Sequence, residues 1–447
     1  METLADTSML KQFGRYVSFN VFGMIGMSVY ILADTFFIAN GVGANGLAAL
    51  NFAIVIWTIM QATGLMLGIG GATKFQVYKS QGNMRDANRT FTNALMIALA
   101  AAAVYLTLVV VFATPISQFL GADAETIGYT DVYLRVLFCF APFFLVNNTL
   151  LPFVRNDGSP QLAMIAMLLG SAANIVLDYL FIMVFGWGMF GAAFATGIAP
   201  VLSMAVLSIH FIKKRNTFTI LKTAPDMLLM RSIAALGLSS FIVEISGGVV
   251  LFIFNLIILH FEGNTGVAAY GIVANLAFVA TALFVGTAQG MQPLSSHCYA
   301  QNHIEDLKKV LRYALTTALV ISVVVIAVGA IFAEPLAIAF NRDNDPRLTA
   351  LAAEGMRLYF LGYLFAGINI VSAAFFSSIE QPAKGLAISI ARGFVSIVAF
   401  VFILAALFGM TGVWITFPAA EAATAIMTCF FLVRFVKSLR RGHVAKA

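Results

Sequence analysis

The sequence predicts an all-α polytopic membrane protein with twelve transmembrane helices in two pseudo-symmetric six-helix lobes. Hydrophobic residues make up 61% of the chain and charged residues only 10%, whereas an ordinary soluble domain has about 25% charged residues. The second observation is an internal repeat. A shift of 220 positions, with no gap, places Gly46-Leu-Ala-Ala on Gly266-Val-Ala-Ala. Such repeats in an apolar chain are typical of transporters whose halves move around a central site.

The repeat stays in register across most of each half. The same shift places Gly70 on Gly290, Gln81 on Gln301 and Asp86 on Asp306. A shift of 222 places Pro160 on Pro382, and a shift of 221 places Gly188 and Gly191 on Gly409 and Gly412. We therefore expect an N-terminal lobe over residues 1–212, a cytoplasmic linker over 213–232 that contains Pro225, and a C-terminal lobe over 233–447.

Twelve apolar stretches reach the roughly 20 residues that a membrane span requires. Six spans in each repeat bring both halves into the membrane from the same side, so we expect parallel repeats. Residues 1–4 include no basic segment and no cleavage site follows them, so no removable signal peptide is expected. The expected spans centre near Val29, Ile59, Ala101, Ala141, Leu169, Ala199, Val250, Phe278, Val324, Ile368, Val395 and Thr424.

Basic residues gather in the loops of one side, together with the tail over 434–446. The opposite loops contain only two basic residues, Arg342 and Arg347, beside several acids. The positive-inside rule then predicts that both termini are cytoplasmic in a plasma (inner) membrane protein. The basic residues of the predicted cytoplasmic loops are Lys11, Arg15, Lys74, Lys79, Arg85, Arg89, Arg155, Lys213, Lys214, Arg215, Lys222, Arg231, Lys308, Lys309, Arg312 and Lys384.

Four acids fall inside the expected spans: Asp34, Asp178, Glu244 and Glu421. An ionised carboxylate at the bilayer centre costs at least ~2.5–3.5 kcal/mol, so such residues normally face a cavity or a partner. Glu421 follows Pro418 closely and is expected to bond the backbone that the proline frees. Arg392 lies deep in a span, and either Glu421 or Glu244 is expected to pair with it.

The acids of the first half have oxygen-bearing neighbours. Asn174 precedes Asp178 by four residues and so shares its helix face. Thr196 lies in the next helix, after a Gly186-Trp-Gly188 turn. Asp34, Asn174, Asp178 and Thr196 together suit a proton or a hard monovalent cation such as Na⁺. The alternative is structural: Asp178 pairs with Arg135 or Tyr179 and holds helices together.

Other function classes lack their motifs. No Walker, nucleophile-elbow, zinc or haem motif occurs, so ATP-driven transport, catalysis and a bound cofactor are not expected. Cys139, Cys298 and Cys429 have no paired spacing. The net charge of +6 is scattered over short loops, which argues against nucleic-acid binding. Met60 and Met66 are candidates for an adaptable substrate cavity.

Several segments resemble the multidrug and toxic compound extrusion (MATE) transporters. The first is Leu32-Ala-Asp-Thr-Phe-Phe-Ile-Ala-Asn-Gly, followed by Gly46-Leu-Ala-Ala-Leu. The others are Arg155-Asn-Asp-Gly-Ser-Pro, Asn174-Ile-Val-Leu-Asp178-Tyr-Leu-Phe-Ile and Gly191-Ala-Ala-Phe-Ala-Thr196. The resemblance covers essentially the whole chain, and the Arg-Asn-Asp-Gly form is most similar to the bacterial MepA-like branch.

The resemblance implies the fold of the MOP superfamily, in which two six-helix lobes form a V-shaped cavity. It implies a cation-coupling site at Asp34, Asn174, Asp178 and Thr196. We also expect substrate binding at Glu244, Asp34 and Asp178. Glu244 matches the seventh-helix glutamate of the sodium-coupled NorM-like members. The tenth-helix acid of those members is missing here, because residues 359–378 contain none.

The expected function is therefore multidrug efflux, in which small amphipathic, often cationic organic compounds leave in exchange for H⁺ or Na⁺. One alternative is a flippase for lipid-linked saccharides from the same superfamily, although the chain has few of the cavity arginines that a pyrophosphate requires. The other is a membrane-embedded enzyme or receptor, which would need no tandem halves.

Overall fold

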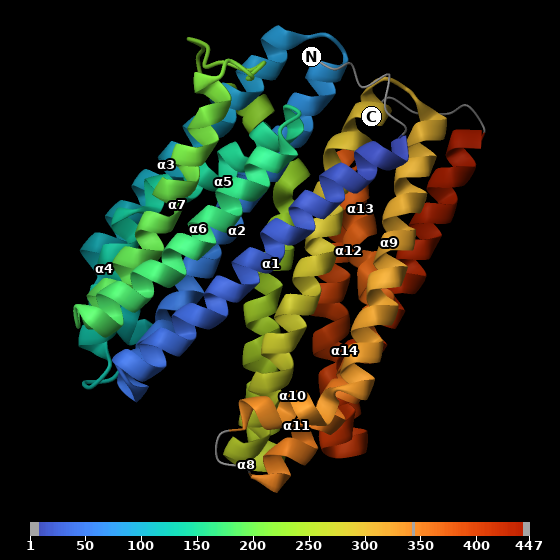
Figure 1. Ribbon diagram of the computed structural model, residues 1–447. Coiled ribbons are helices and arrows are strands. Elements are labelled where there is room, and N and C mark those ends of the chain that lie inside the picture. Colours follow the sequence, from blue (N-terminus) through green and yellow to red (C-terminus); the bar gives the residue numbers. More distant parts are fainter. Residues whose placement is uncertain (1–8, 342–344, 441–447) are drawn as a thin grey trace. The chain divides into compact units, whose positions relative to one another are not determined.

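The computed structural model describes residues 9–341 and 345–440. Within these ranges the chain is helical and contains no strand, and short turns connect most of the helices (Figure 1). The expectations that involve residues 1–4, Arg342 and the tail beyond 440 lie outside the described residues.

The chain divides into two compact units. We call Ser18–Glu244 the N-terminal unit, and the residues up to Val17 together with those from Ile245 onward the C-terminal unit. Helices α1 (Met9–Gly41) and α8 (Met227–Ala300) each contribute residues to both units. The rest of the N-terminal unit consists of α2 (Ala44–Ser80), α3 (Met84–Phe119), α4 (Ile127–Cys139), α5 (Ala141–Asn156), α6 (Pro160–Asp178), the π-helix η1 (Tyr179–Val184) and α7 (Gly188–Ile212).

The C-terminal unit continues after α8 with a second series of helices. They are α9 (Ile304–Ile331), α10 (Ala333–Phe340), α11 (Pro346–Tyr359), the 3-10 helix η2 (Phe360–Gly362), α12 (Tyr363–Ser378), α13 (Pro382–Ile390), the π-helix η3 (Ala391–Val395) and α14 (Ser396–Arg440).

The sequence repeat is visible in the turns. In the turn before α3, the amide of Gly82 donates to the carbonyl oxygen of Lys79 at 3.0 Å. In the matching turn before α9, the amide of Asn302 donates to the carbonyl oxygen of Tyr299, also at 3.0 Å. Both residues have a positive φ, 78° and 56°. The turn at Gly158 (φ 88°) is repeated at Glu380 (φ 56°). The register of the repeat therefore holds in the backbone and not only in residue identities.

Ten helices of the described residues are long and apolar enough to cross a membrane, or eleven if α4 and α5, which meet at a 52° bend, form one span. The last of these stretches covers 58 residues, from Pro382 to Leu439. Gly409 (φ 60°) interrupts it, and each part exceeds the roughly 20 residues of one span. The twelve predicted spans are reached only if the chain is divided at Gly409.

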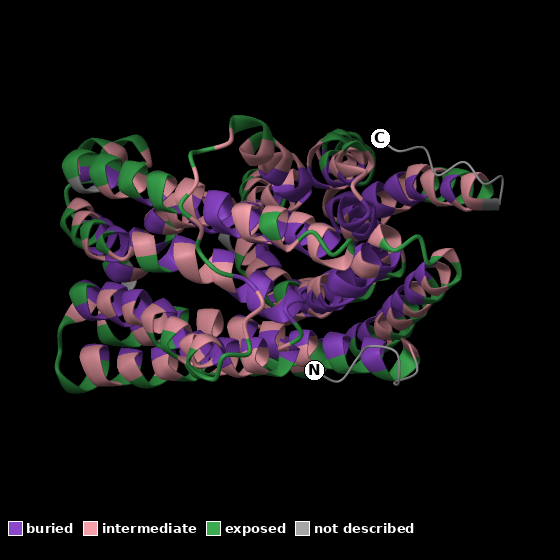
Figure 2. Ribbon diagram, turned by 90° about the horizontal axis from the view of Figure 1, so that it is seen from above, coloured by how far each residue is buried: buried purple, intermediate pink, exposed green. Residues whose placement is uncertain are grey.

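Each unit has its own apolar interior, and the helices carry buried residues on one side and exposed residues on another (Figure 2). Glycines allow close packing in the N-terminal unit. A Cβ atom on Gly26 of α1 would lie 2.5 Å from Cδ2 of Leu168 on α6, and a Cβ atom on Gly237 of α8 would lie 1.9 Å from the carbonyl oxygen of Met66 on α2. A larger residue at either position would therefore prevent α1 from packing this closely on α6, and α8 on α2.

Candidate functional site

Helices α6 and α7 position three of the four predicted coupling residues. Asn174 and Asp178 are completely buried on one face of α6, and Thr196 on α7 is 5% exposed. The Asn174 amide donates a hydrogen bond to Oγ1 of Thr196 at 3.3 Å. The turn between the two elements contains Gly186 (φ 68°) and Gly188 (φ 56°), a conformation that glycine adopts without steric cost.

Asp34 on α1 belongs to the same unit and is 9% exposed. Its carboxylate interacts electrostatically with that of Asp178. The π-helix η1 begins directly after Asp178. Such π-helical turns are frequent at functional sites, because the extra residue shifts the side chains that follow.

Two tyrosines join these acids, and the sequence analysis did not identify either. Tyr133 on α4 is 3% exposed, and its hydroxyl is within interaction range of the Thr196 side chain and of Asp34 and Asp178. Tyr30 is within electrostatic range of the same two acids and of Glu244. Tyr30 precedes Asp34 by one helical turn, a spacing that could have revealed it. Nothing in the local sequence identifies Tyr133, because only the packing of α4 on α7 brings it to Thr196.

Four oxygen atoms of this group are buried without a hydrogen-bond donor among the described residues. They are Oδ1 of Asp34, Oδ1 of Asn174 and both carboxylate oxygens of Asp178. Neither Arg135 nor Tyr179 forms a hydrogen bond with the Asp178 carboxylate. Buried polar atoms are normally satisfied, and an unpaired buried charge costs far more than an unpaired amide. The arrangement therefore suits a proton or a hard cation that binds oxygen.

Of the other predicted substrate residues, Glu244 is within electrostatic range of Tyr30, whereas Met60 and Met66 belong to the apolar core or pack against it. Glu244 on α8 is the last residue of the N-terminal unit and is partly exposed, and its carboxylate has no hydrogen bond or ion pair within the described ranges. Met60 on α2 is completely buried in the apolar core of the unit, and Met66 packs against that core.

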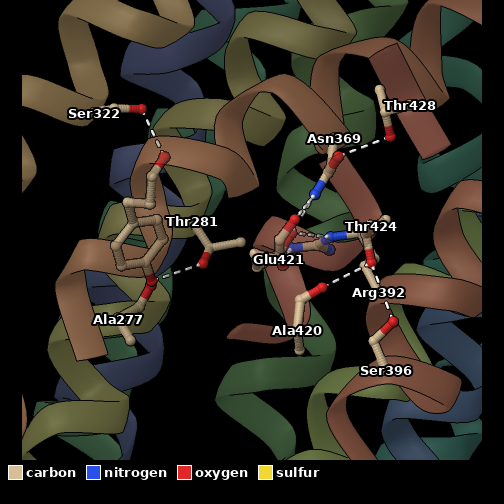
Figure 3. A network of polar contacts seen from close by, with 11 residues as sticks. Ala277, Thr281, Ser322, Asn369, Arg392, Ser396, Ala420, Glu421, Thr424 and Thr428 are labelled. Carbon is tan, nitrogen blue, oxygen red and sulfur yellow. Dashed lines mark hydrogen bonds and ion pairs between the residues drawn. The ribbon is translucent and has the colours of Figure 1, made fainter. Parts of the chain in front are cut away.

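The C-terminal unit also contains a buried acid, but this acid is paired (Figure 3). Glu421 on α14 is 1% exposed, and its Oε1 lies 2.6 Å from Nη2 of Arg392 in η3. Asn369 on α12 donates to Oε2 of Glu421 at 2.7 Å and to its carbonyl oxygen at 2.9 Å. Of the two acids expected as partners for Arg392, the structure therefore pairs it with Glu421 and not with Glu244. The expectation that the Glu421 side chain bonds backbone freed by Pro418 was wrong, because Arg392 and Asn369 occupy the carboxylate.

A second paired acid was missed by the sequence analysis. Asp157, in the turn between α5 and α6, forms an ion pair with Lys79 on α2 and a 2.9 Å hydrogen bond with Nε2 of the buried His210 on α7. The amide of Thr217 donates to it at 2.7 Å. Burial raises the pKa of the Asp157 carboxyl, but the bonds from His210, Lys79 and Thr217 outweigh burial and lower the pKa below 3.8.

A sequence profile of the MatE family matches residues 20–180 and 240–403. Multidrug export protein MepA of Staphylococcus saprophyticus is 27% identical over 412 residues, which cover 91% of this chain and 90% of the relative. MepA of Staphylococcus haemolyticus is 25% identical over 406 residues, 90% of this chain and 89% of the relative.

Solved structures share the fold. An outward-facing multidrug resistance MATE family transporter of the MOP superfamily superposes with a TM-score of 0.92 at 24% identity, over 97% of both chains. A MOP superfamily transporter from Pyrococcus furiosus, described as having a binding pocket of reverse polarity, superposes with a TM-score of 0.90 at 23% identity, also over 97% of both chains. The profile match covers both halves of the chain, and the chain therefore belongs to the MatE family, whose members are membrane transporters and not enzymes.

Proposed function

We propose that the protein exports amphipathic, often cationic organic compounds from the cell by antiport against a cation. Family membership supports transport across a membrane, and the MepA relatives are multidrug export proteins. The observation that carries the coupling proposal is the group of buried oxygens around Asp178 without hydrogen-bond donors. In a low-dielectric interior two neighbouring carboxylates cannot both stay charged cheaply, so the pair takes up a proton or a cation.

The contrast between the units supports a coupling site in the N-terminal unit. The buried Glu421 of the C-terminal unit already has a positive partner in Arg392. Asp34 and Asp178 have no such partner among the described residues, so a transported cation can compensate their charge. A site that must bind and release a cation in each cycle requires acids without a permanent counter-ion.

In the proposed cycle the Asp34 and Asp178 pair shares one proton and carries a single negative charge, and a second proton entering from outside removes that charge. The neutral pair no longer attracts a cationic compound, so α1 repacks and the compound leaves. Loss of the proton to the cytoplasm restores the charge and the affinity for the next cationic compound. No ATP takes part in this cycle.

Sodium is the second candidate ion. Oδ1 of Asn174 and the hydroxyl of Thr196 add neutral oxygens to the two carboxylates, and hard cations prefer such oxygen ligands. We favour the proton, because it needs only the two acids and can be shared between them.

We further propose that the protein is a multi-pass plasma (inner) membrane protein with both termini in the cytoplasm. In this proposal residues 1–212 and 233–447 act as the two lobes, and residues 213–232 link them. The lobes follow from the tandem repeat, and the orientation follows from the basic loops.

Purified protein in liposomes tests the coupling directly. An imposed proton gradient, without sodium, should drive transport of ethidium, and Asp34→Asn and Asp178→Asn should each stop it. Asp131→Asn is the matched control in the same unit, since Asp131 already accepts hydrogen bonds from Ser117 at 2.7 Å and from Thr114. It should retain transport.

Other outcomes separate the alternatives. Transport with a sodium gradient alone, at any pH, would assign the same residues to sodium. Full transport by both Asn variants would mean that Asp34 and Asp178 do not couple transport and have only a structural role. Movement of a lipid-linked saccharide, with no drug transport under either gradient, would favour the flippase.

Glu244 is proposed to bind the positive charge of the substrate. Glu244→Gln should therefore weaken binding of a cationic dye by about tenfold, the effect of one lost charge-assisted bond of roughly 1.5 kcal/mol, and change binding of a neutral dye little. Fluorescence titration of purified protein with both dyes measures this difference. Equal losses for the two dyes would contradict the role.

A further inference from the structure

The segment after α7 is fixed along α3 by side chains of one helix face. The amides of Thr219, Leu221 and Asp226 donate to Oδ1 of Asn88, Oγ1 of Thr92 and Oδ1 of Asn93, at 2.9, 3.0 and 2.9 Å. All six residues belong to the N-terminal unit. The segment after α7 is therefore packed against this unit by specific hydrogen bonds.

Phe218 anchors the same segment in the interior. Its side chain is completely buried, and its ring centroid lies 4.6 Å from that of Phe91 and 5.8 Å from that of Phe153. Thr217, the residue before it, donates to Asp157. These contacts fix the segment against the first turns of α3.

A cavity of about 350 Å³ remains beside this anchor. Its walls come from α3, α5, the end of α7 and the segment over 216–220, and most of the side chains are apolar: Leu95, Val146, Leu150, Phe211, Phe218 and Ile220. Phe211 is the residue before the last of α7, and Leu95 lies three turns into α3. The cavity is therefore close to one membrane face, where the headgroups of a leaflet meet the hydrocarbon.

Exposed apolar side chains flank the cavity. Ile220 is 67% exposed and Ile212 is 75% exposed. In water such exposure is costly, whereas acyl chains cover it without cost.

Three consecutive basic residues lie in the chain between two residues that line the cavity. Lys213, Lys214 and Arg215 stand between Phe211 and Asn216, which both line the cavity. All three are exposed, and no carboxylate of the described residues forms an ion pair with them. Residues 213–225 also contain Lys222 and no acid. Asp226, the next acid, is paired with Arg89 at 3.0 Å.

We propose that this cavity binds an anionic phospholipid of the adjacent leaflet. One acyl chain occupies the apolar cavity, and the phosphate of the headgroup lies on Lys213, Lys214 and Arg215. Basic residues beside an apolar pocket at a membrane face are the combination that recognises such lipids. The site is separate from the proposed transport site, and it needs only that the protein lies in a membrane.

Two variants and one control test the proposal. K213Q/K214Q/R215Q removes the charge without touching the core. Val146→Phe fills the cavity from α5. K308Q/K309Q/R312Q removes the same number of positive charges from the start of α9, where Lys308 and Lys309 are paired with Glu305 and Asp306.

Native mass spectrometry of the full chain in detergent measures binding of dioleoyl phosphatidylglycerol against dioleoyl phosphatidylcholine. The wild type should retain one phosphatidylglycerol and bind it at least tenfold more tightly than phosphatidylcholine. The triple Gln variant should bind phosphatidylglycerol roughly 100-fold more weakly, since each basic residue near the surface is worth on the order of fivefold. Val146→Phe should reduce binding of both lipids, and the control should stay close to the wild type.

Several results would overturn the proposal. These are equal binding of the two lipids by the wild type, an equal loss in the control, or unchanged binding by K213Q/K214Q/R215Q. Glycerol phosphate, which has the headgroup charge but no acyl chain, should not compete, and effective competition would refute the acyl-chain part. If Val146→Phe does not fold, lysophosphatidylglycerols of decreasing chain length give the same test, because binding should weaken as the chain shortens.

Discussion

At the scale of single residues, the presence or absence of a partner distinguishes the buried acids. Asp157 has Lys79, His210 and Thr217, and Glu421 has Arg392 and Asn369. Asp178 has both carboxylate oxygens unsatisfied within the described residues. A permanent partner makes an acid part of the scaffold, and the absence of one is the reason for our proposal that Asp178 binds the coupling ion.

Asp157→Asn should lower the stability of the protein by about 3 kcal/mol, because Lys79 loses its buried counter-ion. The effect should depend on pH. The pKa of Asp157 is lowered on folding, so its stabilisation is present above the unfolded pKa of about 3.9 and is lost as the pH falls through the folded pKa.

Thermal unfolding in detergent between pH 7 and pH 3 measures this. The gap in melting temperature between the wild type and Asp157→Asn should be widest near neutral pH and should close toward pH 3. A gap that stays constant with pH would mean that the ionised carboxylate is not the stabilising form.

At the scale of elements, the Arg392–Glu421 pair connects η3 to α14. Glu421→Met and Arg392→Met each leave one charge of the pair without its counter-ion and should each cost about 3–5 kcal/mol, whereas the double variant R392M/E421M should cost less than either single change. Thermal unfolding of the two single variants and the double variant gives the coupling energy.

The pair of Arg347 and Glu262, 2.6 Å apart in the same unit, is the control, because its side chains are 69% and 21% exposed, more than those of Arg392 and Glu421 at 10% and 2%. Its single variants should cost about 1 kcal/mol or less, since water already solvates the charge that remains. Equal losses of stability at the two pairs would show that the buried pair does not stabilise the packing of η3 on α14.

The turn at Gly158 makes a separate prediction. Nothing lies within 4 Å of a Cβ atom placed there, but φ is 88°, so Gly158→Ala should cost roughly 1–2 kcal/mol from the backbone alone. Gly128 on α4 also has open space and an ordinary helical backbone, so Gly128→Ala should leave the melting temperature unchanged or slightly higher. Equal effects of the two changes in thermal unfolding would exclude a backbone cause.

At the scale of the whole molecule, the proposed orientation predicts which loops an impermeant reagent reaches. In a chain without its three native cysteines, Arg347→Cys should react with a charged maleimide in intact cells. Lys309→Cys should react only after the membrane is opened, because the basic loops are proposed to be cytoplasmic. Both side chains are exposed, at 69% and 55%, so burial cannot explain a difference. The reverse pattern of labelling would invert the orientation.

The sequence by itself determined the helical membrane fold and the tandem repeat. These follow from the apolar composition, from the length of the apolar stretches and from matching residues at a fixed shift, all of which can be read from the chain without its tertiary structure. Asp34, Asp178 and Asn174 could be identified for the same reason, since a polar residue in an apolar span is conspicuous wherever it lies.

Only the tertiary structure decided which groups meet. Glu421 forms an ion pair with Arg392, and Tyr133 lies near Thr196. His210 forms a hydrogen bond with Asp157, although the two are 53 residues apart in the chain. The tertiary structure also placed the segment after α7 along α3, which forms the cavity beside Phe218. Such pairings depend on how helices distant in sequence pack against each other, and no local pattern encodes that arrangement.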